Sequence, residues 1–495
     1  MPIRIDPRLP VIIGVGQVLQ RDTSFEDARE PALLMADAVR SACTDAGLAS
    51  VPAPDSIRTV ELYTCLYPDP GRAVAAHLGV EVRESATTSL GGNSPQSLLN
   101  LTAAEIQRGR IDLAFLSGGE CWRTRTRARR EGVDLGWGDR SSTLGVDRVI
   151  GSRVAMTDKA EEARGIGLAT QVYAMFESAV RARSDQSPQE HQSVVGNLWA
   201  EFSAVAGGNP FAWSRQPKTA EQITAVTASN RLIGLPYTKS MNSNNDVDMA
   251  AALVVCSTAT ASALGVPEDR WVFPHAGVDC RDVPLLSSRW ELGRCPAVRF
   301  GAEALFAVAG IGRDDVEFYD LYSCFPSAVQ VGATEIGIAD GRGLTRTGGL
   351  SFAGGPWNNY SMHAVATVVD DLRRSPGSFG LVWANGEYLT KHAFGLYSTS
   401  PPCGYRSASA QERIDAGPTR PAATEPLSGS GTIDSYTVMH DRAGAPDEAF
   451  ASCLDRDGRR MFARSTSGDV IAALTEREGV GTKVTVDAEG CLRTV

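Results

Sequence analysis

Two stretches of the chain follow the same pattern although they lie far apart in sequence. The first begins at Gly91 and reads GGNSPQSLLNLTAAEIQRGRIDLAFLSGGE, and the second begins at Gly354 and reads GGPWNNYSMHAVATVVDDLRRSPGSFGLVWANGE. Each opens with a glycine pair and a capping residue, continues with apolar residues at helical spacing, and ends in an apolar strand that closes on Gly-Glu. A repeat of this kind predicts two similar α/β halves, with one glycine turn in each.

The helix expected after the first turn has clear boundaries. Ser94 is a good N-cap residue and Pro95 suits the first turn. Leu99, Ala103 and Ile106 then keep the spacing of one buried helix face. The second repeat keeps the same spacing with Met362, Val365, Val369 and Leu372. A strand that feeds a glycine turn at a helix N-terminus is where α/β enzymes often place a nucleophile or bind an anion.

Alternation of strands and helices continues outside the repeats and predicts a mostly parallel sheet with helices on both faces. Strands are expected at 9–18, 56–66 and 111–120, and helices at 30–47 and 71–79. The alternation stops after the first repeat and resumes near residue 246. We therefore expect a first half at 1–120 that is completed by 246–270, an insertion at 121–245, and a second half at 271–400.

The C-terminal part of the chain has a different character. Residues 401–429 form a linker rich in Pro, Ser and Ala, and residues 430–495 contain short strands and hairpin signals such as DRDG. One short helix, DVIAALTER, separates two groups of strands. This pattern predicts a small all-β domain, a β-barrel of OB-like type.

Composition excludes several classes of partner. A net charge of −10 argues against nucleic acid or an anionic membrane as the main partner. The ten cysteines include no C-x-x-C pair, which favours reduced thiols and a cytoplasmic location. The most apolar long stretch, 247–266, carries an aspartate and several hydroxyl residues and is too polar to span a membrane. No residue cluster predicts a metal site or a resident cofactor.

The repeats and the insertion resemble the thiolase superfamily, and in particular the sterol-carrier-protein thiolases and thiolase-like proteins grouped with them. The resemblance covers residues 9–400 and is carried by the first repeat and by NSNNDVDMAAALVVCS, DLYSCFPSAVQ, TRTGGLSFAGGPWNN and LVWANGEY. It implies the five-layered thiolase fold, with a loop-domain insertion over the site. It also implies an acetyl-CoA acetyltransferase-like ancestry in acyl-CoA and lipid metabolism.

Four positions of this chain match the catalytic residues of the family, and all four are changed. Gly92 stands where the nucleophilic cysteine belongs, and Tyr322 where an Asn or His binds the thioester oxygen. Gly355 replaces the histidine of Gly-His-Pro, and Ala384 replaces the second cysteine. Without a thiol no acyl-enzyme forms, and without the second cysteine nothing removes the α-proton. The resemblance therefore implies a degenerate active site without thiolase activity.

Backbone groups do not depend on side chains, so part of the family's site survives in this sequence. The N–H groups of Gly92 and Gly386 match the donors of an oxyanion hole and can hold a thioester carbonyl. The arginine run at 123–130 suits the phosphates of coenzyme A, with Arg125, Arg127 and Arg129 as candidates, against the alternative of a solvated face. We therefore expect a protein that binds an acyl-CoA without turning it over.

Two other functions stay open at this point. One is a non-catalytic scaffold or partner subunit of a lipid-metabolising complex, with a partner protein docked through the C-terminal domain. The other is an acyltransferase with relocated chemistry at Cys324, with His363 or His392 as its base, although a buried structural cysteine is the simpler interpretation. The resemblance implies a dimer, and a monomer is the alternative.

Overall fold

The computed structural model describes residues 5–138, 145–421 and 425–494. Two of its sheets contain the repeats. The first sheet has the strand order β1 (Pro10–Leu19), β8 (Asp248–Ser257), β4 (Leu113–Cys121), β2 (Ser56–Thr59), β3 (Glu84–Thr88) and β5 (Arg148–Ile150). The second has the order β10 (Val316–Leu321), β11 (Phe379–Gly386), β12 (Lys391–Ser398), β9 (Phe273–Arg281) and β13 (Arg406–Ala408).

The two sheets repeat the same strand order and the same directions. In the first sheet β2 and β4 pair in parallel, β4 and β8 antiparallel, and β8 and β1 antiparallel. In the second sheet β10 and β11 pair in parallel, β11 and β12 antiparallel, and β12 and β9 antiparallel. This correspondence confirms the two duplicated halves that the internal repeat predicts.

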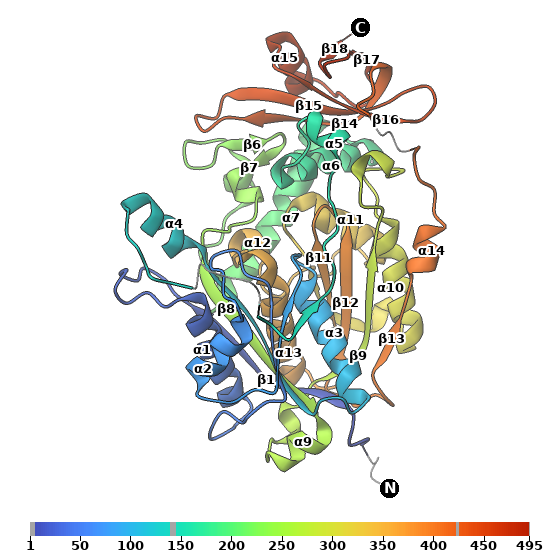
Figure 1. Cartoon of the computed structure of the whole chain (residues 1–495). Coiled ribbons are helices and arrows are strands. Elements are labelled where there is room, and N and C mark those ends of the chain that lie inside the picture. Colours follow the sequence, from blue (N-terminus) through green and yellow to red (C-terminus); the bar gives the residue numbers. More distant parts are fainter. Residues whose placement is uncertain (1–4, 139–144, 422–424, 495) are drawn as a thin grey trace.

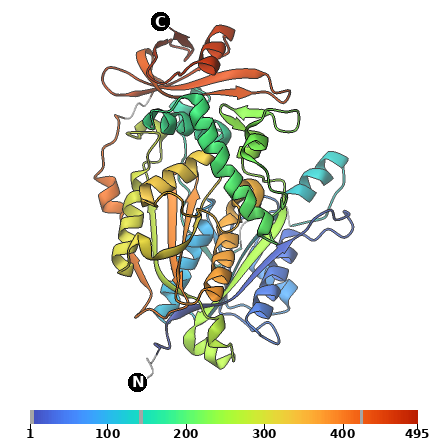
Figure 2. The same cartoon turned by 180° about the vertical axis from the view of Figure 1, so that it is seen from behind.

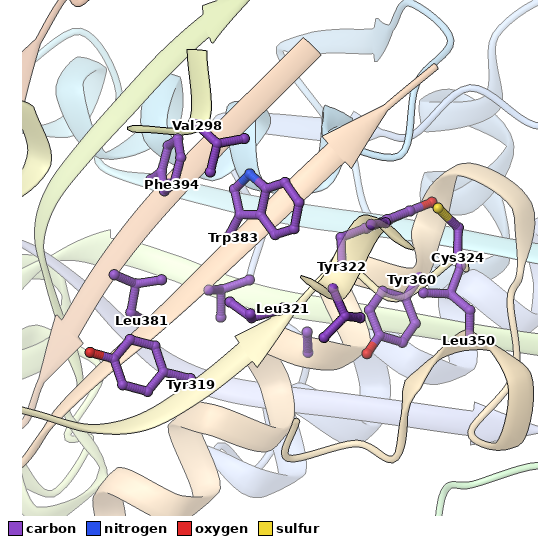
Figure 3. Packing of buried hydrophobic residues seen from close by; sticks show 14 of the residues in the cluster. Val298, Tyr319, Leu321, Tyr322, Cys324, Leu350, Tyr360, Leu381, Trp383 and Phe394 are labelled. Carbon is purple, nitrogen blue, oxygen red and sulfur yellow. The ribbon is translucent and has the colours of Figure 1, made fainter. Parts of the chain in front are cut away.

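Helices complete five layers. The repeat helices α3 (Ser94–Gln107) and α13 (Tyr360–Arg374) contact each other and both sheets, so they form the central layer (Figure 1). One outer layer contains α1 (Pro31–Asp45) and α2 (Pro70–Leu78), and the other contains α10 (Pro296–Ala309) and α11 (Pro326–Ile336). A large apolar cluster includes residues of both halves, and part of it is drawn in Figure 3. A second cluster lies between the first sheet and the helices α1 and α2. The thiolase fold expected from the sequence is confirmed.

The segment between the halves covers one end of this body. It contains α4 (Trp122–Glu131), α5 (Lys159–Ala163), α6 (Ala169–Arg183), α7 (Pro188–Gly208), α8 (Ala220–Thr224), β6 (Leu232–Gly234) and β7 (Tyr237–Thr238). Figure 1 shows α4 projecting from the side of the molecule, away from the other insertion helices. Shorter helices elsewhere are α9 (Thr258–Ala263), α12 (Gly349–Phe352) and α14 (Gln411–Asp415). Within the described residues no helix is long and apolar enough to cross a membrane.

The C-terminal sheet has the order β16 (Arg460–Ser465), β15 (Pro446–Leu454), β14 (Gly429–His440), β17 (Lys483–Val486) and β18 (Leu492–Thr494). A parallel bridge between Arg464 and Cys491 brings the two edges of this sheet together. The helix α15 (Gly468–Glu476) follows β16 along the chain, and β6 of the insertion pairs with β14, so that β6 and β7 extend the same sheet. The five strands of the domain fit the expected OB-like barrel. Figure 2 shows the domain lying across the insertion at the end of the molecule far from the N-terminus.

Two local expectations were wrong. The strand expected at 56–66 ends at Thr59, because the following loop is held by a buried carboxylate rather than by a neighbouring strand. Ser94 is the first helical residue and not the N-cap, which is Asn93. The Ser94 hydroxyl donates to the Ser89 carbonyl at 2.8 Å, so it ties the helix start to the end of β3.

Candidate functional site

The two glycine turns meet at the centre of the fold. A Cβ on Gly386, at the end of β11, would collide with the Asn93 side chain and would lie 3.3 Å from the Gly91 Cα. The start of the second repeat closes over the first turn, because the Gly91 N–H donates to Asn358 Oδ1 at 3.0 Å. Ser361 Oγ donates to the Gly92 carbonyl at 2.9 Å. The fold therefore brings together the segments that the repeat predicts to be equivalent.

Tyr322 occupies the position next to Gly92. A Cβ built on Gly92 would overlap the Tyr322 hydroxyl and would lie 2.5 Å from the Asn385 carbonyl oxygen. The Tyr322 side chain is buried, and its ring packs edge-on against Tyr360 with centroids 5.5 Å apart (Figure 3). Burial raises the pKa of the phenol, so it stays protonated. The structure fills the space of the missing cysteine with a phenol.

The other two replaced positions also lie in packed surroundings. A Cβ on Gly355 would lie 3.3 Å from Asn245 Oδ1 and 3.4 Å from Leu350 Cδ2, so there is room for little more than a methyl group. Ala384 is fully buried in β11, opposite Ala393 of β12. Neither position presents a group that can accept or donate a proton. The four positions that match the family's catalytic residues therefore contain one ionisable side chain, the phenol of Tyr322.

An aromatic layer lies between the glycine turns and the surface. The Trp357 ring stacks on Tyr63 at a centroid distance of 4.5 Å and meets Trp122 edge-on at 4.7 Å. Trp357 has a φ of +46°, which is unusual for a bulky residue, and its backbone N–H donates to the Gly355 carbonyl at 2.7 Å. The turn that follows Gly355 therefore directs an indole toward α4. The sequence analysis gave no role to Trp357 or to its aromatic partners.

Cys324 is buried and lacks a base. Its Sγ lies 4.0 Å from Asn385 Nδ2, and burial raises the pKa of the thiol to about 12. His363 Nδ1 lies instead 2.8 Å from Gln17 Oε1, and His392 Nε2 lies 3.2 Å from Cys295 Sγ. A thiolate is the nucleophilic form of cysteine, and hydrogen bonds from Tyr173 and Asn385 favour it less than burial disfavours it. The structure does not assemble the relocated nucleophile that these three residues suggested.

Both histidines are neutral in the folded protein. Burial lowers the pKa of His363 to about 3 and that of His392 to about 4. His363 Nε2 and His392 Nδ1 have no hydrogen-bond partner among the described residues. The two imidazoles therefore serve as packed side chains in the core.

The arginine run forms α4, and its members point in different directions. Arg127 donates to the Thr23 carbonyl at 3.2 Å and stacks over the Phe25 ring at 4.7 Å. Arg125 and Arg129, one helical turn apart, both line a cavity of about 780 Å³. Tyr63 and Trp122 form part of the same lining. Two of the three expected arginines thus share a cavity with aromatic side chains, and the third belongs to the opposite face of the helix.

Glu120, at the end of β4, shapes this cavity although sequence reasoning gave it no role. Its carboxylate accepts from the Tyr63 N–H at 2.6 Å and from the Thr64 N–H at 2.8 Å. Burial raises the pKa of this carboxyl to about 7 despite these hydrogen bonds. The signal was present in the sequence, since both repeats end in Gly-Glu. In the second repeat Glu387 instead pairs with Lys391 at 2.8 Å.

Cavities in the part of the chain that the structure describes include five with volumes of about 540, 780, 610, 400 and 200 Å³. None of these five has Gly92, Tyr322, Gly355 or Ala384 in its lining. The close contacts that a Cβ would make at Gly92 and Gly355 show that the site inherited from the repeats is packed there. The cavity with two arginines is bordered by the aromatic side chains of Tyr63 and Trp122. Among the described residues no group of three or more His, Cys, Asp or Glu side chains is placed to hold a metal ion.

The chain is similar to known proteins both in its C-terminal domain and over its whole length. Residues 409–491 match the family described as the thiolase-like protein type 1 additional C-terminal domain. The crystal structure of a monomeric SCP2-thiolase-like protein type 1 from Mycobacterium smegmatis is 33% identical, with 99% of this chain and all of that chain covered and a TM-score of 0.85. No curated protein matches the chain by sequence.

More distant structures share the fold. The Ltp2-ChsH2(DUF35) aldolase is 18% identical over 79% of this chain and 98% of that chain, with a TM-score of 0.59. The dimeric peroxisomal thiolase of Saccharomyces cerevisiae is 14% identical over 80% of this chain and 99% of that chain, with a TM-score of 0.56. In each case about a fifth of this chain lies outside the match.

Proposed function

The chain belongs to the family of SCP2-thiolase-like proteins type 1, and on that premise we propose that it binds a coenzyme A derivative without thiolase chemistry. Its place would be in acyl-CoA and lipid metabolism, in the cytoplasm, with neither a cofactor nor a metal of its own. The observation that carries the proposal is the relationship between Gly92 and Tyr322, in which a phenol fills the space of the missing nucleophile.

Loss of chemistry follows from the groups at the four positions. Thiolysis and condensation need a thiolate to take the acyl group and a second base to move the α-proton. Gly92, Gly355 and Ala384 supply neither, and the Tyr322 phenol is held protonated by burial. Cys324, the nearest thiol in sequence, has a pKa of about 12 and no imidazole partner. We expect no acyl-enzyme at neutral pH.

Binding of coenzyme A is supported by the cavity beside α4. Coenzyme A has an adenine ring and three phosphates, and guanidinium groups bind phosphate oxygens in pairs. Arg125 and Arg129 line the cavity with the aromatic side chains of Tyr63 and Trp122, which offer faces for a base to stack on. Arg129 has no ion pair among the described residues, so its charge is available to a ligand.

Titration calorimetry with coenzyme A tests this site. The double variant Arg125→Ala/Arg129→Ala should weaken binding about tenfold or more, and added salt should weaken the wild type in the same direction. Arg127→Ala is the matched control, because it removes the same charge from the opposite face of the same helix. Equal loss in the control would show a diffuse charge effect, and absence of binding by the wild type would refute the proposal.

The acyl group of a bound acyl-CoA needs a separate argument, because the Tyr322 side chain fills the space beside Gly92. We propose that a thioester carbonyl is held by the N–H groups of Gly92 and Gly386 only after the Tyr322 side chain moves. Coenzyme A and acetyl-CoA should therefore bind the wild type with similar affinity. Tyr322→Ala should favour acetyl-CoA over coenzyme A by several-fold. A preference for acetyl-CoA already in the wild type would show that the turns open without substitution.

A second candidate is a partner subunit without any small-molecule ligand, and the filled nucleophile position favours it. One distant relative, the Ltp2-ChsH2(DUF35) aldolase, is an assembly of two proteins. The OB-like domain of this chain would supply the surface for such a partner, whereas the free chain would be a monomer like its M. smegmatis relative. Co-purification from native cells, followed by light scattering, distinguishes a lone monomer from a stable complex.

A further inference from the structure

A second ligand-sized cavity lies on the other side of the first glycine turn. Its volume is about 540 Å³, and its walls come from α3, the segment after β5, β9, the start of β12 and residues 405–411. It shares no lining residue with the cavity beside α4. A volume of this size is typical of sites for small metabolites.

One face of α3 forms the polar wall of this cavity. Asn93, Ser97, Asn100 and Arg108 recur at helical spacing along that face, and all four line the cavity. The Asn100 side chain is almost fully buried but is committed to hydrogen bonds, since it donates to Asp279 Oδ2 at 2.9 Å and accepts from Gln96 at 2.9 Å. Burying polar side chains along a helix costs free energy unless they form hydrogen bonds.

Asp279 stands at the base of the cavity. It lies on β9 between two buried residues, yet its own side chain remains accessible to solvent. The surrounding protein raises the pKa of the carboxyl, and the Ser97 hydroxyl and the Asn100 amide oppose that shift by stabilising the charged form. A carboxylate that is ringed by protein but reachable from outside is placed to accept hydrogen bonds from a bound hydroxyl group.

A second observation comes from Tyr405 on the opposite wall. Its hydroxyl is buried without a hydrogen-bond partner among the described residues. It lies over Gly277, close to the Asn100 side chain, where a Cβ on residue 277 would collide with both. Nearly all buried hydroxyl groups in proteins have a partner. The orphaned hydroxyl is a polar group of the cavity wall that a bound hydroxyl or water would satisfy.

Two arginines stand at the rim with their charges unused. Arg108 follows the last turn of α3 and Arg281 ends β9, and both side chains are exposed. Neither guanidinium makes an ion pair or a hydrogen bond within the described ranges of the chain. Lys391, which also lines the cavity, is already paired with Glu387 and bonded to two carbonyl groups. Arg281 lies two residues after Asp279 on the same exposed face of β9, whereas Arg108 lies at the other end of the cavity, where Gln107 accepts from the Tyr405 N–H.

From this arrangement we propose that the cavity is a binding site for a phosphorylated polyol, with the phosphate at Arg281 and the hydroxyl groups at Asp279 and Asn100. A guanidinium group can bind two phosphate oxygens, and a carboxylate two residues away accepts from vicinal hydroxyl groups. The site is separate from the proposed coenzyme A cavity, and binding there does not require the Tyr322 side chain to move.

Calorimetry with ribose 5-phosphate tests the site, with inorganic phosphate and ribose as half-probes. Ribose 5-phosphate should bind more tightly than either half-probe. Asp279→Asn should weaken it about tenfold, Arg281→Ala should do so at least as strongly, and Arg108→Ala, at the other end of the cavity, should weaken it less. Arg110→Ala is the matched control, because Arg110 is an exposed arginine beside the same helix end and lies outside the cavity lining.

Each outcome decides the proposal. Absence of ribose 5-phosphate binding, or equal loss in Arg110→Ala, overturns it. Phosphate binding as tightly as ribose 5-phosphate would show a bare anion site and would overturn the polyol assignment. Arg125→Ala/Arg129→Ala should leave ribose 5-phosphate binding unchanged while it weakens coenzyme A. Loss of ribose 5-phosphate binding in that variant would place the sugar phosphate in the cavity beside α4 and overturn the second site.

Discussion

The Tyr322 hydroxyl lies where the first atom of any side chain at position 92 would have to be. The two changes therefore belong together, because the glycine removes the nucleophile and also makes room for the phenol. Tyr322 in turn packs against Tyr360, whose hydroxyl donates to the buried Asp320 carboxylate at 2.9 Å. The packing extends from the turn into the core of the second half.

Substitution at position 92 should reveal this coupling as lost stability. Gly92→Ala forces a Cβ against the Tyr322 hydroxyl and the Asn385 carbonyl, and it should lower the free energy of unfolding by about 1–3 kcal/mol. The same substitution in a Tyr322→Ala background should cost less, with a coupling energy of about 0.5–3 kcal/mol in urea unfolding. Strict additivity of the two substitutions would show that the side chains do not compete for one space.

The purified protein should neither cleave 3-ketoacyl-CoA nor condense acetyl-CoA above background. Gly92→Cys should not rescue either reaction, because the proton-transfer groups are still missing at Gly355 and Ala384. Spectrophotometric assays of both directions check this, with an active thiolase as a positive control. Turnover that co-elutes with the protein and persists in a Tyr322→Phe variant would contradict the expectation.

Much of the fold could be predicted because the two repeats can be recognised from the residue types within each segment. The Gly-Gly turn, the helix and the closing strand recur with the same residue types, and these local preferences agree with the sheets that form. The OB-like domain was predictable for a related reason, since its hairpins have strong turn signals. Residues of one element, such as Leu99 and Ile106, were enough to place the buried helix face.

The site could not be predicted to the same extent, because its geometry depends on contacts between distant residues. Nothing local indicates that Tyr322 meets Gly92, or that Trp357 stacks on Tyr63. The arginine run had the right composition, but its helical phase divides Arg127 from Arg125 and Arg129. The sequence showed the positive charge of the arginine run. It did not show which face of α4 borders a cavity, because tertiary packing decides that.

The neutral state of His363 should make the protein sensitive to acid. Burial lowers the pKa of this histidine from 6.5 to about 3. Between these two pH values the histidine is protonated in the unfolded chain and neutral in the folded chain. Its contribution to stability is present above pH 6.5 and is lost as pH falls toward 3. His363→Gln keeps a polar partner for Gln17 but removes this titration.

Unfolding curves of wild type and His363→Gln between pH 7 and 4 check that sign. The stability difference should shift against the wild type by about 1.4 kcal/mol per pH unit below roughly pH 6. A pH-independent difference would show that the imidazole is protonated in the folded state or is reached by water.

Arg460 should control how firmly the C-terminal domain is attached. Its side chain is fully buried, pairs with Asp434 at 2.7 Å and donates to the Leu286 carbonyl at 3.1 Å, so it joins the OB-like sheet to the second half. Arg460→Ala leaves the Asp434 carboxylate without its donor and should cost about 2 kcal/mol or more. Because the domain also has an apolar cluster of its own, it should stay folded after release.

Differential scanning calorimetry should then show two transitions in Arg460→Ala where the wild type shows one. Arg456→Ala is the matched control, since that side chain is 93% exposed in the same domain and its removal should leave a single transition. Two transitions already in the wild type would mean that the domain is not energetically coupled to the body. A single, unshifted transition in Arg460→Ala would mean that the apolar contacts of Phe450 and Phe462 with the main core hold the domain without the buried arginine.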